Sequence, residues 1–199
     1  SGFNESWVVP GAGGTWPVSL VFPSGSGWST PQTVVLNATA DSVAQSESAR
    51  FRLRHVSSSS DGRYSGAAVL PSAVVEGTIV DDDVEGVELS ASSLSVTEGG
   101  SVNGSYTVRL RSRPREGEWA RVTIGGAPSW LHVEPSSVLL GPGNWSVPVT
   151  VSVWSSDDAV SESTADVDLT HAVSGKDGSL YGPSTPVLPS SSVRVRVYD

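Results

Sequence analysis

The chain has 199 residues, no Cys and a formal net charge of −9, with 37% hydrophobic and 17% charged residues. The absence of Cys excludes disulfides, thiol catalysis and Cys-ligated metals, and the acidic balance argues against nucleic acid as a partner. No apolar run approaches the roughly 20 residues of a membrane-spanning helix, so we expect no membrane insertion by this segment.

Alternation of period two, broken by Gly- and Pro-containing turns, predicts an all-β chain. In the first part we expect strands near residues 5–9, 17–22, 31–38, 49–55 and 73–80. In the second part we expect strands near residues 87–90 with 93–97, 105–111, 118–124, 131–139, 146–154, 164–172 and 191–198. Seven short strands in about 115 residues are typical of an immunoglobulin-like sandwich.

The pattern repeats at an interval of about 116 residues, as when Phe51-Arg-Leu-Arg-His55 is set beside Val167-Asp-Leu-Thr-His171. Residues 1–83 contain no counterpart of the stretch that follows Val84. We therefore predict two tandem β-sandwiches, residues 1–83 and 84–199, the first of which lacks its two N-terminal strands. Its uncovered apolar face predicts that a neighbouring repeat or subunit supplies the missing strands.

Charges on the last two strands of each copy predict that these strands pair. In the second copy Asp166 and Asp168 would face Arg194 and Arg196, and in the first copy arginines would face Glu76. Opposite charges on neighbouring antiparallel strands stabilise the pairing.

The residues at 94–100 (LSVTEGG), 105–110 (SYTVRL) and 144–148 (NWSVP), with the acidic pair Asp157-Asp158, resemble Calx-beta domains. The acidic run at 81–83 that closes the first copy adds to this resemblance. The family implies a Calx-beta-like, immunoglobulin-type fold, a calcium site in the acid turns, and tandem arrays in surface and adhesion proteins.

Because successive strands run in opposite directions, alternate turns lie at the same end of a sandwich, and this places the acids of that family's calcium site at one tip of each copy. Calcium prefers six to eight oxygen ligands. In the second copy the expected ligands are Glu98, Asp157, Asp158, Glu162 and Asp199. In the first copy they are Asp41, Glu47, Asp81, Asp82 and Asp83, without the glutamate that precedes the Gly pair. The alternative is that these acids are solvated and bind no ion.

All four Asn lie in N-x-Ser/Thr sequons, at Asn4, Asn37, Asn103 and Asn144. This pattern predicts N-glycosylation in a secretory pathway, whereas in a bacterial source the sequons would carry no meaning. With the family resemblance, it favours an extracellular or cell-surface location.

No set of residues predicts catalysis, and the chain is not expected to be an enzyme. His55 and His171 occupy equivalent positions and are predicted to be core-edge imidazoles bonded to a neighbour. We expect a non-enzymatic extracellular structural or adhesive repeat module, calcium-stiffened and part of a filament or long surface protein. The alternative is a glycan-binding module that uses an exposed Trp154 or the long loops 56–72 and 173–190.

Overall fold

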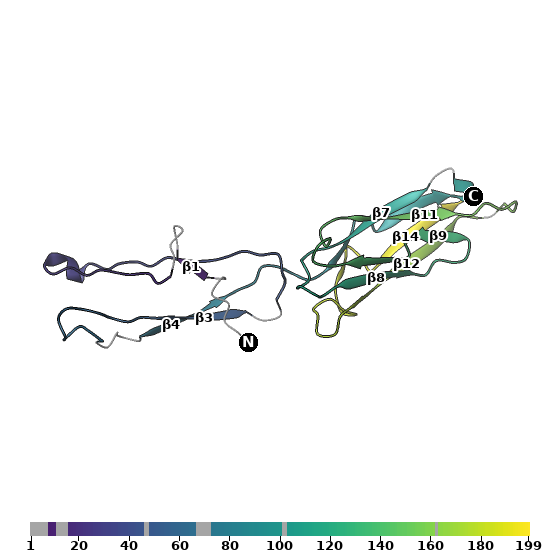
Figure 1. The fold of residues 1–199 in the computed structure, drawn as a ribbon. Coiled ribbons are helices and arrows are strands. Elements are labelled where there is room, and N and C mark those ends of the chain that lie inside the picture. Colours follow the sequence, from purple (N-terminus) through teal and green to yellow (C-terminus); the bar gives the residue numbers. More distant parts are fainter. Residues whose placement is uncertain (1–7, 11–15, 46–47, 67–72, 101–102, 162) are drawn as a thin grey trace. The chain divides into compact units, whose positions relative to one another are not determined.

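The computed structural model describes residues 8–10, 16–45, 48–66, 73–100, 103–161 and 163–199, and it divides into two compact units. Unit 1 comprises residues 1–41 and 47–81, and unit 2 comprises residues 42–46 and 82–199. The described part of the chain is built from strands and two short 3-10 helices (Figure 1), and no described helix is long and apolar enough to span a membrane.

Unit 2 is a sandwich of two five-stranded sheets (Figure 1). One sheet has the order β13-β5-β7-β11-β9, and the other has the order β10-β8-β12-β14-β6. Their strands are β5 (Val87–Leu89), β6 (Ser93–Thr97), β7 (Gly104–Leu110), β8 (Ala120–Gly125), β9 (Leu131–Glu134), β10 (Ser137–Leu140), β11 (Val149–Ser155), β12 (Ala165–Gly175), β13 (Val187–Leu188) and β14 (Ser192–Tyr198). In the immunoglobulin-like sandwich, whose strands are lettered A to G in chain order, strands A, B, E and D form one sheet and strands C, F and G form the other. Here β5, β7, β11 and β9 correspond to A, B, E and D, and β8, β12 and β14 correspond to C, F and G.

The interior of unit 2 is closed on both sides by alternating apolar side chains. Leu110, Leu140, Leu169 and Val195 are each at most 1% exposed, and they come from four different strands of the two sheets. Burying one such side chain stabilises the fold by about 1.5–3 kcal/mol. The predicted all-β sandwich is confirmed in this unit.

Two predictions on strands in unit 2 need correction. The predicted strand 131–139 is two strands, because Pro135 interrupts it: β9 pairs with β11 in one sheet, and β10 pairs with β8 in the other. The predicted loop 173–190 contains the end of β12 and the two-residue strand β13, which pairs in parallel with β5.

The described residues of unit 1 form two separate two-stranded sheets. Strand β1 (Val8–Pro10) pairs with β2 (Leu36–Ala38), and β3 (Ala49–Arg54) pairs with β4 (Val74–Ile79). The predicted strand at 17–22 is wrong: residues 18–23 are irregular and lead into η3 (Ser26–Ser29). The described residues of this unit include no counterpart of β5, β6 and β7. Strand β2, the counterpart of β11, therefore lacks the partner that β7 gives to β11, and β1 pairs with the backbone of β2 instead.

The predicted charge pairing of the last two strands is confirmed in both units. Arg194 Nε donates to Asp168 Oδ1 at 3.0 Å, and Arg196 Nε donates to Asp166 Oδ1 at 2.8 Å. In unit 1 Arg52 lies opposite Glu76 and donates to its carboxylate at 2.6 Å. The neighbouring arginines hold the pKa values of Asp166 and Asp168 below their usual range, chiefly through these hydrogen bonds.

His171 is buried at the edge of the core of unit 2, as predicted, whereas His55 is exposed and corrects the prediction for its site. The Nδ1 atom of His171 lies 3.4 Å from the carbonyl oxygen of Ser191, and its Nε2 lies 2.7 Å from the Tyr106 hydroxyl. Because a carbonyl only accepts, Nδ1 carries the proton and Nε2 accepts from Tyr106. Burial lowers the pKa of His171, outweighing the backbone hydrogen bonds that raise it.

This burial predicts a loss of stability in mild acid. Below about pH 6.5 the unfolded chain binds a proton at His171 that the folded chain rejects, so the free energy of unfolding falls as the pH decreases through this range. We expect denaturant unfolding between pH 7.5 and 5.5 to show a steeper loss of stability in the wild type than in His171→Gln. Parallel losses in the two proteins would contradict this assignment.

Candidate functional site: the acidic tip of unit 2

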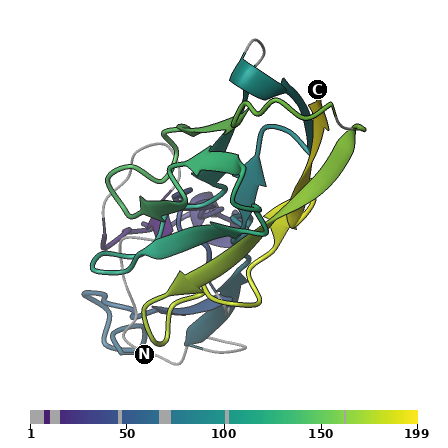
Figure 2. The same cartoon turned by 90° about the vertical axis from the view of Figure 1, so that its right-hand side faces the viewer.

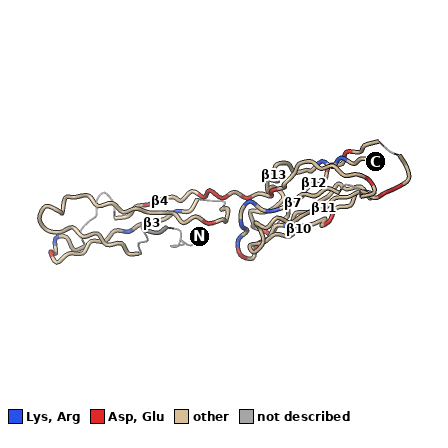
Figure 3. Tube along the Cα trace, turned by 90° about the horizontal axis from the view of Figure 1, so that it is seen from above, with Lys and Arg blue, Asp and Glu red and all other residues tan. Residues whose placement is uncertain are grey.

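Three segments far apart in the sequence meet at one end of unit 2. They are η4 (Glu98–Gly100), which follows β6, the turn that follows β11, and the end of β14. Figure 2 shows η4 and the C-terminus at the same end of the unit, and Figure 3 shows acidic residues at this end. A cavity of about 100 Å³ lies here, and its lining includes Glu98, Asp158 and Asp199. The predicted gathering of these three acids is present.

The carboxylates at this tip hold the local backbone. Glu98 Oε1 accepts the backbone N–H of Asp158 at 3.0 Å, which ties η4 to the turn after β11. Asp158 Oδ1 accepts the N–H of Val160 at 2.7 Å and shapes that turn. Two of the acids therefore act as acceptors for peptide groups that would otherwise lack a partner.

Asp157 lies against the backbone of Gly99, where a glycine is needed. A Cβ at Gly99 would lie 3.1 Å from Asp157 Oδ1, and the φ of Gly99 is 71°, which lies in the left-handed region. The Glu-Gly-Gly sequence thus brings the acidic turn close to η4, a role that the sequence pattern did not reveal.

The remaining lining of the cavity is mixed. It includes Trp130, Ser155, Ser163, Ala165 and Val197. The backbone carbonyl of Trp130 accepts from the N–H of Ser156, so the residues that follow β11 and precede β9 are joined next to the cavity lining. Glu162, the fifth predicted ligand of this tip, lies outside the described residues.

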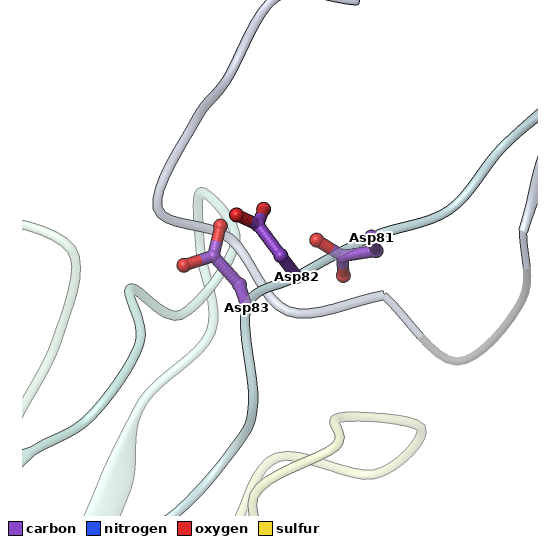
Figure 4. Close-up of side chains that lie close together, drawn as sticks. All are labelled: Asp81, Asp82 and Asp83. Carbon is purple, nitrogen blue, oxygen red and sulfur yellow. The ribbon is translucent and has the colours of Figure 1, made fainter.

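The four described acids of this tip do not converge to metal-binding distance. Among the described residues, one group of three acids has ligand atoms all within 4.8 Å of one another: Asp81, Asp82 and Asp83 (Figure 4). Asp82 is exposed, and Asp81 and Asp83 are half-buried. Of the other ligands predicted for the first copy, Asp41 is exposed and not part of this group, and Glu47 lies outside the described residues.

The other predicted site residues occupy varied positions. Asn37 on β2 and Asn103 before β7 are exposed, as glycan attachment requires, and Asn4 lies outside the described residues. The Asn144 side chain accepts from the N–H of Gly141 at 2.7 Å and donates to the carbonyl of Leu139 at 3.2 Å, so its amide holds a turn. Trp154, predicted to be exposed, is half-buried because His132 stacks on it.

No family model matches the chain, and no curated protein matches it. Among solved structures, the chain is similar to the CBD1 domain of Calx in a crystal structure of its apo form. The TM-score is 0.39 and the sequence identity is 14%, over 58% of this chain and 98% of the Calx domain. A likeness of this size extends to the fold at most, so membership in the Calx-beta family stays a prediction.

The hydrogen bond from the Asp158 amide to Glu98 predicts that this amide is protected from hydrogen exchange. In Glu98→Ala the acceptor is lost, and we expect the Asp158 amide to exchange its hydrogen about tenfold faster, the equivalent of one ordinary hydrogen bond. Glu98→Gln keeps an oxygen acceptor and should exchange nearly as slowly as the wild type. The rate is measured at this amide by NMR-detected hydrogen exchange in the wild type and both variants. Equal rates in all three proteins would contradict the assigned contact.

Proposed function

We propose that the chain is a non-enzymatic structural or adhesive repeat module of an extracellular or cell-surface protein, whose units associate with further strands of their own kind. The observation that carries the proposal is the contrast between the two units. Leu110 is 1% exposed in unit 2, whereas Leu20 is 40% exposed in unit 1. No residue of unit 1 whose burial is described is buried.

The exposed side chains of unit 1 are large and apolar. They include Val18, Leu20, Phe22, Trp28 and Val35, of which Trp28 is 68% exposed. Apolar side chains left in water forfeit the main stabilising contribution to folding, and unpaired strand edges accept further strands. Strand β7 of unit 2 supports this proposal as a template, because it pairs with β11 along its edge and adds Tyr106 and Val108 to the core.

The proposed partner is therefore a segment with the alternation of residues 84–112, which form β5, β6 and β7 in unit 2, supplied by a neighbouring repeat or subunit. Addition of such strands would join modules end to end, as a filament or a long surface protein requires. The sequons at Asn37 and Asn103 support an extracellular setting because both side chains are accessible.

A peptide experiment tests the strand partner. A synthetic peptide that copies residues 84–112 is added to the full chain, and hydrogen exchange with mass spectrometry is followed over residues 16–45. We expect saturable binding and slower exchange in these residues, because the added strands pair with exposed backbone groups.

The matched control is the same peptide with Val108→Ser and Leu110→Ser, which removes the apolar face but keeps the length. Equal protection by both peptides would contradict the proposal. So would a wild-type chain whose residues 16–45 are already as protected as β7.

We further propose that calcium binds the acid turns and orders them. At the tip of unit 2 Glu98 and Asp158 each accept a peptide N–H. A carboxylate has about four lone-pair sites, so accepting a peptide N–H does not prevent it from coordinating an ion, which would draw the acids of this tip closer together. Flexible turns rich in carboxylates bind calcium with affinities down to the millimolar range in extracellular modules. The group of Asp81, Asp82 and Asp83 is the second proposed binding point.

Calcium binding predicts a rise in thermal stability by mass action. At about ten times the dissociation constant, the free energy of unfolding should increase by about 1.4 kcal/mol. We expect Asp158→Asn, which keeps an oxygen for the Val160 amide but removes the charge, to reduce the shift in melting temperature. Asp177→Asn, on the exposed turn after β12, should keep it.

Calorimetric titration with calcium and with magnesium separates specific coordination from general screening of charge. A wild-type melting temperature that is unchanged at about 10 mM calcium would contradict the calcium proposal. This outcome would leave the strand-partner proposal standing, because the two rest on different residues.

A further inference from the structure

The outer face of the sheet that contains β7, β11 and β9 carries a row of hydroxyl side chains. Ser152 of β11 lies opposite Ser105 of β7, and Thr150 lies opposite Thr107. These four side chains are exposed or half-buried and point away from the core, since the intervening residues Val151 and Val153 are buried. This face therefore offers a row of outward-facing hydrogen-bonding groups.

An aromatic pair lies beside this row. Trp154 of β11 is the register partner of His132 of β9, and their rings stack with centroids 5.3 Å apart and planes 21° apart. His132 Nε2 in turn lies 2.6 Å from the Ser156 hydroxyl. The imidazole is thus held on one side by a hydrogen bond and on the other by the indole, so the pair is fixed before any ligand arrives.

A groove of about 500 Å³ runs along this pair, lined by residues 132–137 and Trp154. Ser137 belongs to this lining, and among the described residues its Oγ is the one buried side-chain polar atom without a hydrogen-bond partner. A buried hydroxyl without a partner is destabilising, and a ligand or water that reaches it can restore the bond. The carboxylate of Glu134 is exposed in the same groove.

We propose that this groove binds an uncharged oligosaccharide. The flat apolar face of a sugar ring packs on the Trp154–His132 pair, while its hydroxyl groups bond to Glu134 and to the serines of the groove and the adjoining row. The occupant is uncharged because Glu134 is the only charged side chain in the lining, and neither Lys nor Arg lies there to pair with a sugar carboxylate or sulfate.

A protein partner fits this face less well. Stable protein interfaces bury about 800 Å² on each side around an apolar centre, whereas the outward positions of β7 and β11 nearest the groove, Ser105, Thr107, Thr150 and Ser152, all carry hydroxyl groups. A small polyhydroxylated ligand matches the hydroxyl row and needs one aromatic contact point.

The test is a panel of neutral oligosaccharides of different linkage, with sialylated and sulfated glycans in parallel, titrated into the full chain. Binding is followed by tryptophan fluorescence and by NMR shifts of the backbone amides. We expect at least one neutral oligosaccharide to bind, with shifts concentrated at residues 132–137 and 152–154. The affinity should not change when calcium is chelated, because the groove does not include the acidic tip.

Variants separate the groove from the rest of the surface. Trp154→Ala should weaken binding by about tenfold or more, whereas Trp154→Phe keeps an aromatic face and should lose less. Trp119→Ala removes another exposed tryptophan and should leave the affinity unchanged. Equal melting temperatures of the wild type and Trp154→Phe show that the fold is retained.

Four outcomes would overturn the proposal. The first is no binding of any neutral oligosaccharide at about 10 mM. The second is equal affinity in the wild type and in Trp154→Ala, and the third is a preference for acidic glycans over neutral ones. NMR shifts confined to the opposite sheet would also place the ligand elsewhere.

Discussion

Two short segments of unit 2 each pass from one sheet of the sandwich to the other, and the closed interior depends on them. Residues 87–97 contribute β5 to the first sheet and β6 to the second, and residues 131–140 do the same with β9 and β10. Each crossing adds buried side chains to both layers, such as Val87 and Val96. An apolar interior forms only when two sheets face each other at about 10 Å, so the strands that close both layers determine whether a core exists.

The acidic tip shows how the same residues can have a structural and a binding role. Glu98 and Asp158 accept backbone N–H groups from a turn that has no strand partner of its own. A cation at the same oxygens would add to these bonds, since a carboxylate accepts from several directions. The fold of the turn and the affinity for an ion are therefore coupled, because both draw on the position of the same carboxylates.

Most of the strands of unit 2 and the pairing of its last two strands could be predicted from the sequence, because alternation and cross-strand charge are local signals. The split of residues 131–140 could not be placed, although Pro135 marked it, since a run of alternating residues carries no information on which sheet each half joins. The alternating direction of the strands predicted that Glu98, Asp158 and Asp199 lie at one tip, but it could not predict the distances between them. The three carboxylates of residues 81–83, whose oxygens lie within 4.8 Å of one another, depend on local backbone geometry. The contact of Trp154 with His132 depends on the register of β11 and β9, which the sequence leaves open.

The reversal of charge between the two units has a consequence for folding of the whole chain. Tandem domains with similar sequences misfold when a strand of one pairs with the wrong neighbour in the other. If β14 were to pair with β3, Arg194 and Arg196 would face Arg50 and Arg52, and if β12 were to pair with β4, Asp166 and Asp168 would meet Glu76. Like charges on facing strands repel, so each exchange is penalised on both partners. The last two strands pair in the same way in both units, but their charges do not match across the units, so each strand is directed to its own domain.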